Sequence, residues 1–129
     1  MSEIDITGRS VRSPRSHRGR MAERAGRAAE ELVARHYASV GMQPVARRWR
    51  AREGELDLVV RGDGVLIFVE VKSGRNAPYA LGHRQWARLE AAALRYIVDH
   101  EMGDIPSRFD VALVSPDGAV DVVENARMI

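Results

Sequence analysis

The sequence contains no cysteine and only one lysine among its 20 basic residues. Without cysteine, neither a disulfide framework nor a thiolate metal site can form. The longest purely apolar run, Val65 to Val69, is far too short to cross a bilayer. The arginine- and serine-rich start of the chain has no apolar segment of the kind found in secretory signals. These absences predict a soluble, cytoplasmic protein with no membrane partner.

Charge is distributed unevenly along the 129 residues, a length that suits one domain with a modest core. Residues 1–27 carry a net charge of +4, and the remainder carries −2. Serine, arginine and glycine dominate residues 1–20, which show no apolar periodicity. We therefore expect a disordered basic arm over 1–20 and a single domain over 21–129. The arm could contact a phosphate backbone, although a solvated tail is the simpler interpretation.

Apolar spacing predicts an α/β domain with the element order α-β-β-β-α-β-β. Helices are expected over 21–40, with Val40 on the core face, and over 83–101. Strands are expected over 44–51, 55–61, 65–72, 109–114 and 119–123. The second and third strands should form a hairpin around residues 62–64, with Leu56, Leu58 and Val60 on one face. The continuous apolar start of the third strand predicts a central position, covered on both faces.

That hairpin carries the residues with the clearest chemistry. A turn at residues 62–65 places Asp57 opposite Glu70, and Lys72 shares the face of Glu70. Cross-strand neighbours lie only about 5 Å apart at Cβ, so the two carboxylates repel unless a proton or a cation intervenes. Mg²⁺ prefers carboxylate and water oxygens. The sole lysine could then orient or deprotonate a water, or neutralise charge on a phosphoryl transition state, where a guanidinium is no substitute.

The simpler alternative is an ordinary ion pair, because an isolated E-x-K matches by chance. The aspartate at hairpin spacing and the preceding buried run favour a functional site, since unpaired buried charge is costly. Glu30 borders the apolar stripe of the first helix and is either a third ligand or a partner of Arg27. Gln85 could hydrogen-bond the carboxylates or the substrate, or cap its helix. Glu55 is either a ligand or merely exposed.

The two strand motifs, Gly54-Glu55-Leu56-Asp57-Leu58 and Phe68-Val69-Glu70-Val71-Lys72, resemble the bacterial YraN-like family of predicted endonucleases. The resemblance spans about residues 24 to 115. It implies a restriction-endonuclease-like fold with a central mixed sheet flanked by helices, the PD-(D/E)xK motif, and similarity to archaeal Holliday-junction resolvases. The matching functional residues are Glu30, Asp57, Glu70, Lys72 and Gln85. Ala29 and Arg84 stand where the family often has glycine and lysine, which affects contacts more than the metal centre.

We expect a nuclease that uses Mg²⁺ or Mn²⁺ to hydrolyse DNA phosphodiesters, with branched or structured DNA as a candidate substrate. Asp57 and Glu70 would hold the metal with help from Glu30. Plausible phosphate contacts are Arg47, Arg48, Arg50, Arg75 and Arg84. The alternatives are a non-catalytic nucleic-acid-binding module and a partner-binding protein. A symmetric homodimer would suit the cutting of two strands, but no interface is evident in the sequence.

Overall fold

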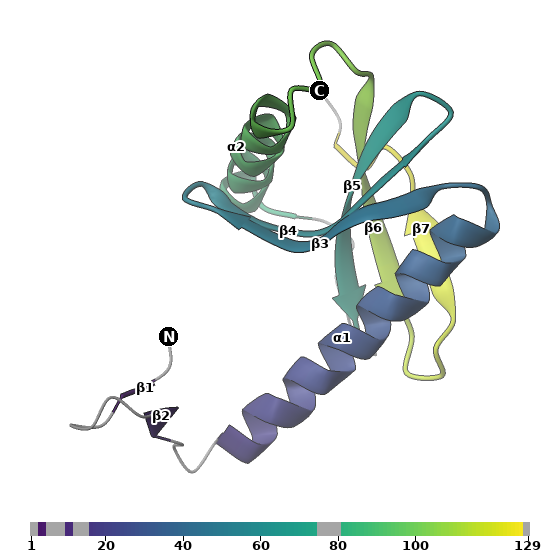
Figure 1. The fold of residues 1–129 in the computed structure, drawn as a ribbon. Helices are drawn as coiled ribbons and strands as arrows, with labels where there is room; N and C mark the ends of the chain where they lie inside the picture. The colour runs from purple at the N-terminus through teal and green to yellow at the C-terminus, as the bar shows by residue number, and fades with distance from the viewer. Residues whose placement is uncertain (1–2, 5–9, 12–15, 75–80, 128–129) are drawn as a thin grey trace.

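The computed structural model of the chain describes residues 3–4, 10–11, 16–74 and 81–127. Within these ranges, five strands form one mixed sheet in the order β3-β4-β5-β6-β7 (Figure 1). Helices α1 (Ser16–Ser39) and α2 (His83–Asp99) cover opposite faces of that sheet. The α/β class and the element order predicted from the sequence are confirmed. Neither helix combines the length and the apolar character that a bilayer crossing requires, as far as the described residues go.

The sheet combines an antiparallel half with one parallel pair. Strand β5 pairs antiparallel with β4 and parallel with β6, and β7 returns antiparallel along β6. The strand bounds are β3 (Gln43–Ala51), β4 (Gly54–Gly62), β5 (Val65–Ser73), β6 (Ser107–Val114) and β7 (Val120–Val123). Gly62 pairs with Val65, so Asp63 and Gly64 form a two-residue loop with φ of 51° and 74°. Left-handed residues at both positions match the twist of a tight hairpin.

The segment expected to be a disordered arm, residues 1–20, is described only in part. Helix α1 begins at Ser16 rather than at residue 21, and strands β1 (Glu3–Ile4) and β2 (Ser10–Val11) pair with each other. The expected start rested on apolar spacing, which residues 16–20 lack; Arg18 and Arg20 are good helix formers, whereas Gly19 is not. Residues 5–9 and 12–15 of the predicted arm lie outside the described residues. At its other end the helix stops at Ser39, so Val40 is exposed instead of facing the core.

Two apolar clusters fill the space between the sheet and the helices. One joins α1 to the sheet through Ala29, Val33, Tyr37, Leu58, Val60, Ile67 and Val69. The other joins α2 to the opposite face through Leu56, Val59, Phe68, Trp86, Leu89, Ala93 and Tyr96. Strand β5 contributes to both clusters, which confirms its predicted central position.

The prediction that Leu56, Leu58 and Val60 share one face of the sheet is wrong. Leu56 packs with α2, whereas Leu58 and Val60 pack with α1. The β4–β5 ladder extends no further than the pair Leu58–Val69, and the first half of β4 pairs only with β3. This two-stranded ribbon leaves the sheet and reaches α2 (Figure 1), and two-stranded ribbons twist more strongly than larger sheets. Asp57 stands where β4 separates from β5.

Candidate active site

Asp57 is held at the separation of two strands by a backbone hydrogen bond. The ladder register that pairs Leu58 with Val69 places Asp57 opposite Glu70, as the hairpin spacing predicted. At this point the Val71 N–H donates to Oδ2 of Asp57 at 2.9 Å. The carboxylate thus bonds to the β5 backbone at the point where the backbone ladder between β4 and β5 has ended. A carboxylate anchored in this way has little freedom to turn from its neighbours.

Glu70 gathers the remaining polar groups predicted from the sequence. Its Oε1 lies 3.5 Å from Nζ of Lys72 and 3.4 Å from Nε2 of Gln85, which donates to it from the first turn of α2. The carboxyl groups of Glu70 and Asp57 lie close enough for each to shift the pKa of the other. Glu70 is 13% exposed and Lys72 26% exposed, so solvent reaches the ammonium more readily than the carboxylate. The four residues form one cluster at the edge of the buried sheet.

The two carboxyl groups resist ionisation. Burial raises the pKa of Glu70 from 4.5 to about 7, and the charge of Asp57 adds to this while Lys72 opposes it. Burial also raises the pKa of Asp57, against the Val71 N–H, and the charge of Glu30 raises it further. Like charges at short range in a desolvated place favour either a shared proton or a bound cation. The cluster is therefore short of positive charge at neutral pH, since Lys72 is the one cation paired with Glu70 in the part of the chain that the structure describes.

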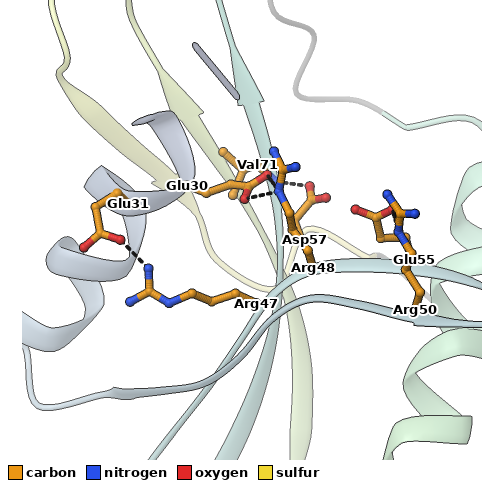
Figure 2. Close-up of polar contacts among 8 residues, drawn as sticks. All are labelled: Glu30, Glu31, Arg47, Arg48, Arg50, Glu55, Asp57 and Val71. Atoms are coloured by element: carbon orange, nitrogen blue, oxygen red, sulfur yellow. Dashed lines mark hydrogen bonds and ion pairs between the residues drawn. The ribbon is translucent and has the colours of Figure 1, made fainter. Parts of the chain in front are cut away.

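Glu30 is bound by Arg48, an arginine of the edge strand β3 that was not among the partners considered for it. Nε of Arg48 donates to Oε2 of Glu30 at 2.9 Å and to Oε1 at 3.2 Å. Figure 2 shows Glu30 on α1, Arg48 on β3 and Asp57 on β4 pointing toward one another. Glu30 is close enough for its charge to raise the pKa of Asp57. It thus borders the carboxylate cluster.

The expected phosphate-binding arginines are placed in different surroundings. Arg47 pairs with Glu31, and Arg50 pairs with Glu55 through Nε and Oε2 at 2.9 Å (Figure 2). Arg48 pairs with Glu30, and Arg84 is exposed in the first turn of α2. Arg75 lies outside the described residues. The carboxylates of β4 and α1 thus compete with any phosphate for the three arginines of β3.

The donor set suits a hard divalent cation. Among the described residues, no group of three or more histidine, aspartate or glutamate side chains is arranged to hold a metal. Two close carboxylates are present, however, and Mg²⁺ commonly binds through one or two carboxylates and keeps several waters. Asp57 and Glu70 would be its protein ligands. Bound there, the cation would supply the positive charge that the raised pKa values show to be lacking.

Sequence reasoning missed the most buried charged residue in the described part of the chain, Asp110. It is fully buried and accepts hydrogen bonds from the Tyr37 hydroxyl at 2.7 Å, from Nε of Arg108 at 3.0 Å and from the Asn125 N–H at 3.0 Å. Burial and Asp110 together raise the pKa of Tyr37. The signal was an aspartate within the apolar run of β6. These bonds fasten α1 to the sheet and so help to fix the helix that carries Glu30.

Together, the mixed sheet and this cluster define an α/β protein with paired carboxylates and a lysine at a strand divergence. Residues 29–114 match the uncharacterised protein family UPF0102, and the chain belongs to this family. It is 46% identical to a UPF0102 protein of Ruegeria pomeroyi over 113 residues, which cover 84% of this chain and 92% of the relative. A UPF0102 protein of Roseobacter denitrificans is 42% identical over 116 residues, 87% of this chain and 90% of the relative. One from Frankia casuarinae is 42% identical over 101 residues, 74% and 86% of the two chains.

Proposed function

We propose that this protein is a Mg²⁺- or Mn²⁺-dependent nuclease that hydrolyses DNA phosphodiester bonds. The observation that carries the proposal is the proximity of the Asp57 and Glu70 carboxyl groups at the point where β4 leaves β5, with Lys72 3.5 Å from Glu70. Such a pair suits a divalent cation, and an adjacent ammonium suits a reaction that develops negative charge on phosphoryl oxygens. The PD-(D/E)xK resemblance of the two strand motifs supports the same chemistry.

Each residue of the cluster would have a distinct part in hydrolysis. Asp57 and Glu70 would hold the cation, which when bound would supply Lewis acidity toward the phosphate and a more acidic water. Lys72 would hold the attacking water or neutralise the charge that builds on the phosphate. The attacking water gives one proton to solvent and its oxygen bonds to phosphorus, the bond from phosphorus to one deoxyribose oxygen breaks, and that oxygen takes a proton from solvent. Gln85, which donates to Glu70, would keep that carboxylate turned toward the cation.

The substrate class is proposed on charge and on the resemblance. Arginines supply 19 of the 20 basic residues, and Arg84 is exposed on the helix that carries Gln85. A guanidinium group can donate two parallel hydrogen bonds to one phosphate, which suits binding of a DNA backbone. The resemblance to junction resolvases makes branched DNA the first substrate to test, with a homodimer as the arrangement that would cut two strands.

The test is a cleavage panel with matched variants. Purified protein is incubated with single-stranded, duplex, flapped and four-way DNA in Mg²⁺, in Mn²⁺ and in EDTA. Glu70→Ala and Lys72→Ala should abolish cleavage, and Asp121→Asn, an exposed aspartate of β7, should retain it. Binding that is sensitive to salt, without cutting of any substrate, would favour a non-catalytic nucleic-acid-binding module instead. Absence of any DNA binding would favour a partner-binding protein.

A further inference from the structure

Arg48 has a backbone conformation that its strand does not require. Its φ is +48°, although it lies in β3 between the ladder pairs Arg47–Leu58 and Trp49–Leu56. Residues with a side chain adopt this left-handed conformation reluctantly, and never as part of a regular strand. The unusual residue stands opposite Asp57 in the β3–β4 register. Strained residues of this kind gather at functional sites, where the strain serves to place a group.

The left-handed conformation changes where the side chain of Arg48 can reach. Adjacent residues of a regular strand point to opposite faces of the sheet. Here both Arg47 and Arg48 reach carboxylates of α1, namely Glu31 and Glu30 (Figure 2). The conformation of Arg48 therefore brings a second guanidinium to the α1 side, beside the carboxylate cluster.

The Arg48–Glu30 ion pair is partly buried, and solvent still reaches both side chains. The Arg48 side chain is 28% exposed and the Glu30 side chain 16%. An Nη atom of Arg48 lies close to α1 at Gly26, where a Cβ would come within 3.7 Å of it. Gly26 precedes Glu30 by one helical turn, so the guanidinium lies along the helix with no side chain over it at that position. A phosphate oxygen can approach the guanidinium where solvent now does.

From this geometry we propose that Arg48 exchanges the Glu30 carboxylate for a phosphate oxygen of the DNA backbone when substrate binds. The exchange would release Glu30 beside Asp57 only in the complex with DNA. The inference rests on the proposed function, because it takes DNA as the ligand. Arg48 is thus assigned as a substrate-binding residue, and Glu30 as a competitor for it in the free protein.

The chemistry of the two partners permits this exchange. A planar guanidinium binds carboxylate and phosphate with the same two-donor geometry, so each can replace the other without a change in the arginine. Once released, Glu30 would add a third carboxylate to Asp57 and Glu70, whose carboxyl groups already adjoin. Additional negative charge favours a divalent cation at such a place. DNA binding and cation binding would then strengthen each other, as linkage requires.

The test measures DNA binding in EDTA, so that it depends neither on metal nor on cleavage. Fluorescence anisotropy gives the Kd of a labelled four-way junction and of a duplex for wild type, Glu30→Gln, Arg48→Gln and the double variant. Glu31→Gln is the matched control: it removes one charge from the neighbouring position of α1 and frees Arg47, which is 49% exposed. Thermal unfolding checks that each variant is folded.

Glu30→Gln should tighten DNA binding by about fivefold or more, the lower end of typical coupling between sites. The slope of log Kd against log salt should stay nearly unchanged in Glu30→Gln, because Arg48 contacts a phosphate in both complexes, and should become shallower by about one unit in Arg48→Gln. Glu31→Gln should change Kd by less than about twofold, since exposed ion pairs hold their partners weakly. In the Arg48→Gln background, Glu30→Gln should have no effect beyond that of Glu31→Gln.

Three results would overturn the exchange. One is an equal effect of Glu30→Gln and Glu31→Gln, which would indicate only general charge. Another is an effect of Glu30→Gln that persists without Arg48. The third is absence of DNA binding by all variants, which would remove the proposed function as well. If the Kd values of the variants change as expected but no DNA of the cleavage panel is cut, this inference is supported and the nuclease proposal is refuted. The two proposals can therefore fail separately.

Discussion

Replacing Glu70 with glutamine should stabilise the metal-free protein at pH 8 and have much less effect at pH 4. In the folded chain the pKa of Glu70 is raised from 4.5 to about 7, through burial first and the charge of Asp57 second. Below pH 4.5 both the folded and the unfolded chain hold the proton. Between pH 4.5 and 7 only the folded chain holds it, so the free energy of unfolding falls as pH rises. Above pH 7 the contribution of this proton to stability is fully lost.

The size of the effect follows from the shift. A shift from 4.5 to about 7 corresponds to roughly 3 kcal/mol, at about 1.4 kcal/mol per pH unit. Glu70 is only 13% exposed, so solvent screening reduces this little. Glutamine keeps the shape and an acceptor for Gln85 but carries no charge. At pH 8 the variant should therefore unfold about 10 °C above the wild type.

Urea unfolding in EDTA, followed by tryptophan fluorescence at pH 4.5, 6 and 8, gives the difference directly. The buried Trp86 and the partly buried Trp49 serve as the probes. Asp121→Asn, at an exposed position, is the control and should show a difference that does not change with pH. Adding Mg²⁺ at pH 8 should stabilise the wild type by mass action but not Glu70→Gln. The reasoning is refuted if Glu70→Gln gains no stability relative to wild type between pH 4.5 and 8.

Three further substitutions test other parts of the structure. Tyr37→Phe deletes the hydroxyl that donates to buried Asp110 at 2.7 Å, and should cost about 1–3 kcal/mol in urea unfolding. Gly62→Ala would place a Cβ 2.5 Å from the Met42 sulfur and 2.9 Å from a backbone oxygen. Calorimetry should show a loss of about 1–3 kcal/mol, as for other overpacked sites, and an unchanged melting temperature would contradict the predicted clash. Lys72→Arg keeps the charge but not the compact ammonium, so single-turnover cleavage should fall by about 100-fold or more, with DNA affinity within about twofold. Wild-type cleavage by Lys72→Arg would show that only charge is needed.

The sequence by itself determined the elements and the core of the site wherever local spacing governs structure. A two-residue turn fixes the register of a hairpin, so the facing positions of Asp57 and Glu70 could be counted from Asp63 and Gly64. The alternation of side chains along a strand then placed Lys72 beside Glu70. The continuous apolar run of β5 predicted its central place in the sheet.

Only the tertiary structure decided which distant groups meet this cluster. The pairing of Arg48 with Glu30 depends on a left-handed residue in β3 and on the packing of α1 across the sheet, neither of which leaves a periodic signal. Leu56 packs on the face opposite to the predicted one because β4 leaves β5 at Asp57, whereas the prediction from strand alternation assumes a continuous ladder. Asp110 was visible as a polar residue in an apolar strand, but its partners come from α1 and the C-terminal segment. The spacing of apolar residues predicts which residues are buried. Which buried charged residues become neighbours depends on how distant elements pack, and this is seen only in the folded chain.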